Sequence, residues 1–446
     1  MTATETRHWG PETDKAIANF PVSGERMPIG VVHWMARLKA DAARANAALG
    51  LLEPAIADRI AAAGEEVAAG RWDDQFPLDV FQTGSGTSTN MNVNEVLASL
   101  AGDDVHPNDH VNLGQSSNDT FPSAVHLATL DAVTATLLPA LEQLAGSLSS
   151  KADEYADVVK SGRTHMMDAV PVTLGQEFAG YATQVRLGID RIEATLGRVG
   201  QLPLGGTATG TGLNTHPEFA ARVLELLGAR AAFSVSQPVD RFEAQANRDA
   251  LVELSGALKV VAVSLMKVAT DIRLMGSGPR AGIAELELPS LQKGSSIMPG
   301  KVNPVMVEVV CQTMAQVIGN DAAITLGGMQ GQFELNVGIP LIARNILHST
   351  TIMASASRLF AERCVDGLEV QQERCEQYAE ASLAVATALN PFIGYDRATE
   401  IVQQAHASGR TLREVARELG VDDSTLDQAL DMRAMAAGGI PQGAGS

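Results

Sequence analysis

The segment LVELSGALKVVAVSLMKVATDIRLM, residues 251–275, decides the fold class of this 446-residue chain. Its apolar residues recur at alternating steps of three and four, which is the period of an α-helix. No proline interrupts the segment, and Gly256 is its one glycine. A helix this long and apolar buries its seam best in a bundle. We therefore expect a helix bundle, completed by further subunits of an oligomer.

Other parts of the chain show the same helical period. The leucines within residues 127–148 recur at steps of three, four or seven, and residues 27–49 and 53–69 are rich in alanine. A further helix is expected from Pro304 onwards, because a helix tolerates proline in its first turn. Aromatic residues make up only 4% of the chain, which favours helices over sheets. The sequence therefore predicts an all-α protein.

Three regions of the sequence differ in the length of their helical segments and in their content of polar loops, and we expect three domains. Residues 1–115 alternate short helices with polar loops and form the expected N-terminal domain. Residues 116–371 contain the long amphipathic segments and form the expected central bundle. Residues 372–446 are expected to form a small helical domain that ends in an unstructured, glycine-rich tail.

The charge and the cysteines limit the possible partners and compartments. The formal net charge is −19, and such a surface repels the phosphates of nucleic acids. A local cationic pocket could still bind a small acidic substrate. The three cysteines lack a paired metal spacing and are typical of reduced, cytosolic thiols. We find neither a signal-peptide pattern nor an uninterrupted apolar run of membrane-spanning length, so we expect a cytoplasmic protein with no membrane partner.

Four polar clusters interrupt the helical pattern. They are Thr83–Asn92, His106–Asp119, Ser161–Pro171 and Gly294–Pro304. We expect each cluster in a loop between helices. Loops that join long, rigid helices come together at the ends of a bundle, so the four clusters are candidates for a single site.

The fourth cluster, GSSIMPGKVNP, spans Gly294–Pro304 and precedes a predicted helix. Consecutive backbone N–H groups together with Lys301 can bind an anion. A nucleotide-binding P-loop is excluded, because five residues rather than four separate Gly294 from Gly300. In addition, Val302 follows the lysine where a P-loop has Ser or Thr.

GSSIMPGKVNP closely resembles the signature of the fumarase/aspartase superfamily, in its class II fumarate hydratase form. The other three clusters match this family in the same order, over nearly the whole chain. The resemblance implies a three-domain, all-helical homotetramer with a long central helix bundle, in which three subunits build each active site. It implies reversible anti addition of water to fumarate, giving (S)-malate in the tricarboxylic acid cycle, with no cofactor and no metal.

Such a reaction needs a carbon base and strong fixed positive potential, because its intermediate is a dianionic aci-carboxylate. By resemblance, Ser295 is that base, and neighbouring N–H groups and a cation must stabilise its alkoxide. His165 would act in the acid half of the reaction through a water, and Glu308 would hold it in its working state. Lys301 and Asn303 would bind the substrate carboxylate. The other substrate-binding residues implied by the resemblance are Ser85, Gly86, Thr87, Ser116, Ser117, Asn118, Thr164, Ser296 and Val302.

Two alternatives to the hydratase remain. An aspartate ammonia-lyase would resemble this chain closely, but such enzymes generally carry glutamine at the position of His165. A catalytically silent superfamily member, kept as a structural protein, is the other alternative. Retention of every proposed catalytic residue argues against it.

Two further motifs have weaker interpretations. The family's second, non-catalytic dicarboxylate site corresponds to His106, Pro107, Asn108 and Asp109. The loop before it is short and carries Asp103 and Asp104, so we expect weak dianion binding there. The glycines of Gly205–Asn214 (GGTATGTGLN) are interpreted as turn formers, because no strand precedes them.

Overall fold

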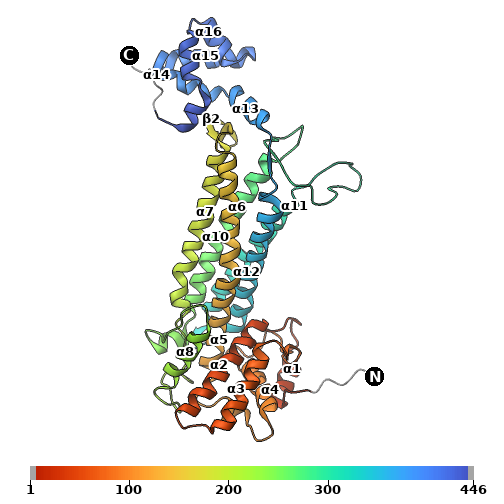
Figure 1. Cartoon of the computed structure of the whole chain (residues 1–446), viewed down its shortest axis with the longest axis vertical. Helices are drawn as coiled ribbons and strands as arrows, with labels where there is room; N and C mark the ends of the chain where they lie inside the picture. Colours follow the sequence, from red (N-terminus) through yellow and green to blue (C-terminus); the bar gives the residue numbers. More distant parts are fainter. Residues whose placement is uncertain (1–6, 440–446) are drawn as a thin grey trace. The chain divides into compact units, whose positions relative to one another are not determined.

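The computed structural model describes residues 7–439, and part of the expected C-terminal tail lies outside these bounds. The described chain consists of helices with three small two-stranded sheets, so the predicted all-α class is confirmed (Figure 1). It divides into two compact units. The first comprises Met1–Ala140, Gly188–Val263 and Gln312–Ser355, and the second comprises Leu141–Leu187, Ser264–Cys311 and Ala356–Ser446. The division at residues 115 and 371 stays a prediction.

The first unit is built around closely packed short helices. A Cβ at Gly64 would lie 2.8 Å from the carbonyl oxygen of Ala36, so this glycine allows α2 and α3 to approach closely. Both helices fall within the ranges predicted for them. The elements of this unit are α1 (Pro11–Asn19), α2 (Ile29–Ala48), α3 (Pro54–Ala68), η1 (Asp73–Gln75), α4 (Thr87–Ala101), η2 (Pro107–Val111), α5 (Ser117–Ala132), η3 (Val133–Leu137), α8 (Phe219–Arg230), α9 (Arg241–Ala246), β4 (Gly331–Gln332) and β5 (Leu335–Asn336).

Five long helices contribute residues to both units: α6 (Leu138–Glu154), α7 (Leu174–Val199), α10 (Asp249–Met275), α11 (Val305–Gly328) and α12 (Ile339–Phe360). Helix α10 confirms the helix predicted from its period, and its seam residues Leu254 and Ile272 are fully buried. Within the first unit, the Ser255 hydroxyl of α10 donates to Asp321 of α11 at 2.7 Å. Within the second, the Tyr181 hydroxyl of α7 donates to Asp271 of α10 at 2.9 Å.

One helical stretch of the described chain, Ser117–Glu154, is long and apolar enough by composition to cross a membrane. The sequence analysis expected no such run. In the structure 61% of its most apolar window is buried, as in the core helix of a globular protein. Its predicted seam is buried as well, and Leu127, Leu137 and Leu148 have no exposed surface.

The second unit ends in a set of short helices with an apolar cluster of their own. Leu389, Ile401 and Leu426 lie fully buried in this cluster. Thr411 begins α16 with a capping box, which satisfies backbone donors that a short helix otherwise leaves unpaired. The remaining elements of this unit are β1 (Val159–Thr164), β2 (Met167–Thr173), β3 (Leu286–Glu287), η4 (Ala361–Val365), β6 (Glu369–Val370), α13 (Gln372–Ala381), η5 (Leu383–Leu389), α14 (Asn390–Ile393), α15 (Tyr395–Ser408), α16 (Leu412–Glu418), α17 (Asp423–Ala429) and α18 (Met432–Ala437).

The expectation that every polar cluster lies in a loop is wrong for parts of three clusters. The cluster Ser161–Pro171 belongs to an antiparallel hairpin of β1 and β2. Helix α4 already begins at Thr87, because Gly86 turns the chain there with a φ of 76°. The cluster His106–Asp119 contains a π-helical turn and the first turn of α5. Polar side chains occur here because they cap and turn the backbone as well as bind ligands.

Candidate active site

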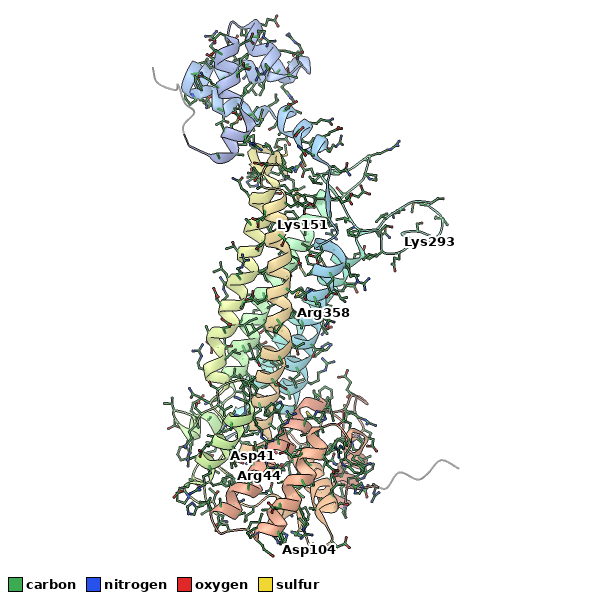
Figure 2. The ribbon with its side chains drawn as sticks, viewed as in Figure 1. Asp41, Arg44, Asp104, Lys151, Lys293 and Arg358 are labelled. Atoms are coloured by element: carbon green, nitrogen blue, oxygen red, sulfur yellow. The ribbon has the colours of Figure 1, made fainter. Side chains whose placement is uncertain are left out.

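The loop Gly294–Pro304 closes on itself through its backbone. The Gly294 N–H donates to the Lys301 carbonyl at 2.9 Å, and the Asn303 side chain donates to the Gly294 carbonyl at 2.7 Å. A Cβ at Gly294 would collide with the Lys301 backbone, so this closure requires glycine. Figure 2 labels Lys293 on this extended segment between α10 and α11.

The hydroxyl of Ser295 accepts two backbone hydrogen bonds within this loop. Its Oγ accepts hydrogen bonds from the N–H groups of Ile297, at 3.2 Å, and Met298, at 3.1 Å. Two N–H donors aimed at one oxygen stabilise negative charge on it. The same two donors would stabilise an alkoxide at this position.

His165 lies at the tip of the β1–β2 hairpin. Thr164 pairs with Met167, which leaves His165 and Met166 as the two turn residues. Their φ angles are 55° and 61°. Positive φ at both positions matches a type I′ turn, whose twist suits a two-residue hairpin connection. The turn projects the imidazole beyond the last strand pair.

Two charged residues of β1, Arg163 and Lys160, pair with carboxylates outside the hairpin. Arg163 donates from Nη2 and Nη1 to the two oxygens of Glu285, at 2.8 Å and 3.0 Å. Lys160 lies 3.3 Å from Glu285 and 2.9 Å from Glu177. Burial alone would lower the pKa of Arg163, but Glu285 raises it above its ordinary value. These contacts connect the hairpin to Glu285, which is fully buried and directly precedes β3.

A cavity of about 1000 Å³ lies in the second unit. Lys301, Val302 and Asn303 line it, whereas Ser295 and His165 do not. The sequence analysis did not identify the three arginines that share the wall, because no motif includes them. They are Arg273, Arg280 and Arg374, and they outnumber the two carboxylates of the wall, Glu287 and Glu369.

The first unit contains six of the proposed substrate-binding residues, Ser85, Gly86, Thr87, Ser116, Ser117 and Asn118. The Ser85 and Thr87 hydroxyls are 2.8 Å apart at the start of α4. A Cβ at Gly86 would collide with the Phe121 ring of α5, so glycine lets the start of α4 lie directly on α5. The segment Ser116–Asn118, which begins α5, therefore packs against the same helix start.

Hydrogen bonds fix the segment Ser116–Asn118 from several sides. The Ser116 hydroxyl caps α5 by accepting from the Asn118 N–H at 3.2 Å. Asn90 donates to the Ser117 hydroxyl at 3.0 Å, and the Asn118 side-chain amide donates to the Ala208 carbonyl at 2.9 Å. The loop Gly205–Asn214 thus touches a proposed site residue, a contact that its sequence did not predict.

The remaining proposed residues are Glu308 on α11, Ser296 in the signature loop Gly294–Pro304, and Thr164 at the end of β1. Glu308 is exposed in the first turn of α11, and Ser296 is exposed next to Ser295. Glu308 belongs to the second unit, as do Thr164 and the signature loop. The proposed residues of one chain therefore form two groups, one in each unit.

The proposed second dicarboxylate site, His106–Asp109, is an exposed turn. His106 Nδ1 accepts from the Asp109 N–H at 3.1 Å. Arg59 binds both oxygens of Asp104, at 2.7 Å and 2.6 Å, and thereby lowers the pKa of that carboxyl. The charge of Asp104 is therefore largely compensated, which weakens one reason for expecting poor dianion binding.

Among residues 7–439, no group of three or more acidic, His or Cys side chains could bind a metal.

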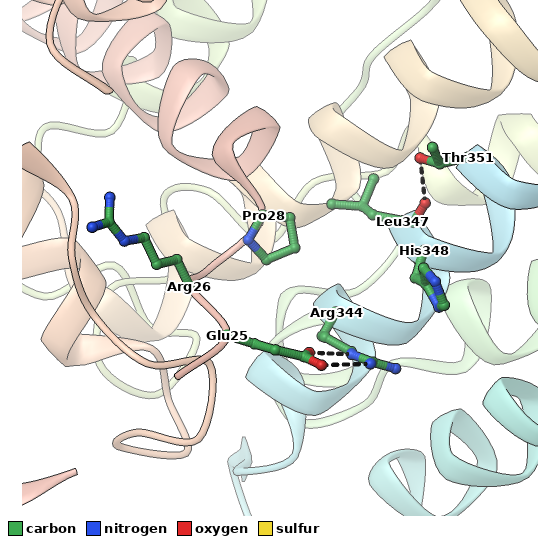
Figure 3. A pocket seen from close by; sticks show the side chains of 7 residues that line it. All are labelled: Glu25, Arg26, Pro28, Arg344, Leu347, His348 and Thr351. Atoms are coloured by element: carbon green, nitrogen blue, oxygen red, sulfur yellow. Dashed lines mark hydrogen bonds and ion pairs between the residues drawn. The ribbon is translucent and has the colours of Figure 1, made fainter. Parts of the chain in front are cut away.

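A second cavity, of about 460 Å³, lies in the first unit between Glu25–Pro28 and α12 (Figure 3). Arg344 donates to both oxygens of Glu25, at 2.8 Å and 3.0 Å, so its charge is already neutralised. Figure 3 shows Arg26 pointing away from this pair. Burial lowers the pKa of His348, which disfavours its cationic form. We do not assign this cavity to an anionic ligand.

Comparison with known proteins places the chain in a family. Residues 1–319 match the family described as Lyase, and residues 385–437 match Fumarase C C-terminus. The class II fumarate hydratase of Corynebacterium glutamicum is 54% identical over 438 residues, which cover 96% of this chain and 93% of that protein. The class II fumarate hydratase of Mycobacterium tuberculosis is 53% identical, with coverages of 96% and 92%.

Solved structures agree with this placement. The class II fumarase from Schistosoma mansoni is 40% identical, covers 96% of both chains and superposes with a TM-score of 0.93. A 3-carboxy-cis,cis-muconate lactonizing enzyme from Pseudomonas putida, at 24% identity and a TM-score of 0.74, shares the fold alone. This chain therefore belongs to the lyase family that includes the class II fumarate hydratases.

Proposed function

We propose that this protein is a fumarate hydratase, which adds water reversibly and in anti fashion to fumarate and gives (S)-malate in the tricarboxylic acid cycle. The observation that carries the proposal is the Ser295 hydroxyl, whose oxygen accepts two backbone N–H bonds within a closed loop. An ordinary capping serine would offer a comparable geometry. The same loop, however, carries Lys301 and Asn303, and curated relatives at 53–54% identity are class II fumarate hydratases.

The proton-transfer roles are those that the family resemblance assigns to these residues. In the direction from malate, the Ser295 alkoxide takes the proton from the carbon beside a carboxylate. Charge then moves onto that carboxylate, which Lys301 and Asn303 bind, and their fixed donors stabilise the dianionic intermediate. His165, acting through a water, protonates the departing hydroxyl on the opposite face. Glu308 positions His165.

The other proposed residues hold the substrate in place. A small dicarboxylate presents four carboxylate oxygens, and hydroxyl, amide and backbone groups are the neutral donors that bind them. Several of these groups in the described structure are fixed by hydrogen bonds to neighbouring elements, so they are preorganised for binding. The hydrogen-bonded members are Ser85, Thr87, Ser116, Ser117 and Asn118, and the proposed set also includes Gly86, Thr164, Ser296 and Val302. His106–Asp109 would form the second dicarboxylate site.

The active form is a homotetramer in which three subunits contribute to each active site. Apolar residues of the catalytic loops support this proposal, because in a single chain Ile297 is 83% exposed and Met167 is 69% exposed. Large apolar side chains exposed beside catalytic groups mark surfaces that another chain covers. We place this assembly in the cytoplasm, without metal, cofactor, nucleic acid or membrane partner.

The test follows the ultraviolet absorbance of the fumarate double bond while purified protein is offered L-malate and, separately, L-aspartate. We expect absorbance to grow with malate alone. Ser295→Ala and His165→Asn should abolish this growth, whereas Ser408→Ala and His406→Asn, at exposed positions of α15, should not.

Two outcomes would contradict the proposal. Growth with aspartate alone would make the protein an ammonia-lyase. If neither substrate changes the absorbance although the protein is folded and is tetrameric by light scattering, the protein is a non-catalytic member of the family.

A further inference from the structure

We propose that Lys39 and Asp119 are positioning residues, which together hold the loop Gly205–Asn214 against the start of α5 and so fix the side-chain amide of Asn118. The inference rests on the proposed function, because Asn118 is a substrate-binding residue only there. Neither Lys39 nor Asp119 belongs to the proton-transfer groups or to the proposed substrate contacts.

Asp119 joins the start of α5 to the loop. Its Oδ1 accepts from the Ser116 N–H at 2.9 Å and from the Thr120 hydroxyl at 3.1 Å. Its Oδ2 accepts from the N–H groups of Gly205, at 3.0 Å, and Thr207, at 2.9 Å. An ionised carboxylate is an acceptor only, so it suits four donors. A protonated Asp119 would direct an O–H at one of these donors and break the connection.

The loop in turn orients Asn118. The Ala208 carbonyl accepts one N–H of the Asn118 amide at 2.9 Å, which leaves the other N–H and the amide oxygen for a ligand. Thr207 has a φ of 53°, a conformation that β-branched residues rarely adopt. Its surroundings must therefore hold it there, and Gln245 contributes by donating to the Thr207 carbonyl at 2.7 Å.

Lys39 supplies the buried positive charge behind this arrangement. Its side chain on α2 is fully buried, and Nζ donates to Asn112 Oδ1 at 3.2 Å and Gln115 Oε1 at 3.1 Å. These two residues lead directly into Ser116. Both partners are neutral, so a buried ammonium needs a carboxylate nearby to remain charged.

The two buried charges act on each other. Burial lowers the pKa of Lys39 to about 7, while the Asp119 carboxylate opposes this shift. Burial raises the pKa of Asp119 to about 6, against the hydrogen bonds from Ser116, Thr207 and Gly205. Lys39 bonds Asn112 and Gln115, the residues that lead into Ser116, whose N–H donates to Asp119. The other groups at its carboxylate are neutral N–H and hydroxyl donors.

The consequence is a dependence of substrate binding on the charge of Lys39. In a Lys39→Met variant, Asp119 loses its compensating charge, and its pKa rises further. Over the pH range below this raised pKa the carboxyl takes up a proton, and the loop Gly205–Asn214 loses its anchor. At higher pH Asp119 ionises again, and the anchor returns.

The experiment measures malate turnover between pH 6 and 9 for the full-length wild type, Lys39→Met, Asp119→Asn and Thr207→Gly. Lys259→Met is the matched control, because Lys259 pairs with Asp321 at 2.6 Å on other helices of the same unit. At pH 7 we expect Lys39→Met to raise KM about tenfold, which is the effect of losing one hydrogen bond to a charged ligand. At pH 9 we expect the KM of this variant to return to the wild-type value. Asp119→Asn should raise KM at every pH, since it cannot ionise.

Three results would overturn the inference. One is a wild-type KM in Lys39→Met at pH 7, and another is a defect in that variant that persists unchanged at pH 9. The third is a fall in kcat without a rise in KM. Thr207→Gly frees the loop without disturbing the buried charges, so it should raise KM with no change in pH profile. It keeps the test available if either charge variant fails to fold.

Hydrogen exchange of residues 205–214, measured by mass spectrometry, separates this inference from the proposed function. Exchange should be faster in Lys39→Met than in Lys259→Met at pH 7, whether or not the protein turns over malate. If the wild type shows the expected hydrogen exchange but no turnover of malate, only the proposed hydratase function is refuted. Equal exchange in the two variants would refute the positioning role alone.

Discussion

Replacing Arg163 with methionine removes the main partner of a fully buried carboxylate. In the folded protein, Glu285 receives two hydrogen bonds from Arg163 and one contact from Lys160 at 3.3 Å. After the change only Lys160 remains, and Glu177 shares it. The variant therefore leaves a buried charge with part of its compensation, while the methionine fills much of the volume of the lost side chain.

The magnitude follows from the number and kind of bonds lost. Each hydrogen bond to a charged group contributes about 1.5–3 kcal/mol, and breaking a buried pair by removing one partner costs about 3–5 kcal/mol. We expect a loss near the lower end, about 3 kcal/mol, because Lys160 still compensates part of the charge. Chemical denaturation followed by far-ultraviolet circular dichroism measures the change in unfolding free energy.

Arg198 and Glu253 provide the matched control. This pair also joins a guanidinium to both oxygens of a carboxylate, but its side chains are 53% and 44% exposed. Water and salt screen such a pair, so Arg198→Met should leave the denaturation midpoint unchanged. If Arg163→Met and Arg198→Met shift the midpoint equally, burial of Glu285 has no energetic consequence and the reasoning fails. Glu285→Gln combined with Arg163→Met should restore part of the loss, since no unpaired charge remains.

Other changes test separate features of the structure. Gly294→Ala should lower kcat about 100-fold, because the added methyl group would force Lys301 out of place. The thermal midpoint should stay unchanged, and a normal kcat in this variant would refute the closed loop. Burial lowers the pKa of His126 to about 4, so its contribution to stability, roughly 3 kcal/mol, is present above pH 6.5 and lost as the pH falls through 4. Denaturation at both pH values should show this loss in the wild type and not in His126→Gln. Burial raises the pKa of Cys364 and Cys375 to about 12, so iodoacetamide at pH 8 should label them, by mass spectrometry, only after unfolding.

Helix α10 was predictable because its apolar period is strong and uninterrupted, whereas no helix was predicted over α7 or α12. Helix α10 begins and ends within two residues of the predicted seam 251–275. The β1–β2 hairpin was not predictable, because its turn residues, His165 and Met166, are not the Asn-Gly or Gly-rich pairs that signal such turns. Its bulge next to Gly162 further breaks the alternation expected of strands.

A candidate site could be named from the sequence only as far as its motifs extend, and its residues stay a prediction. Ser295 and Lys301 were identified from one contiguous cluster, and the structure shows how that cluster closes on itself. Lys39, Asp119 and Glu285 could not be identified in this way. Charged residues are rarely buried, so sequence reasoning places them on the surface by default. Their burial depends on contacts between segments that lie far apart in the chain, which local patterns do not encode.

The left-handed turn at His165 also limits how this enzyme could evolve. A side chain branched at Cβ is strongly disfavoured at a φ of 55°, so valine, isoleucine and threonine are poor replacements there. Glycine fits the backbone but brings no functional group, which leaves histidine and a few unbranched polar residues such as asparagine. Substitution at this position is therefore restricted to that short set of residues while the two-residue turn is kept. Wider substitution would require the hairpin to lengthen first.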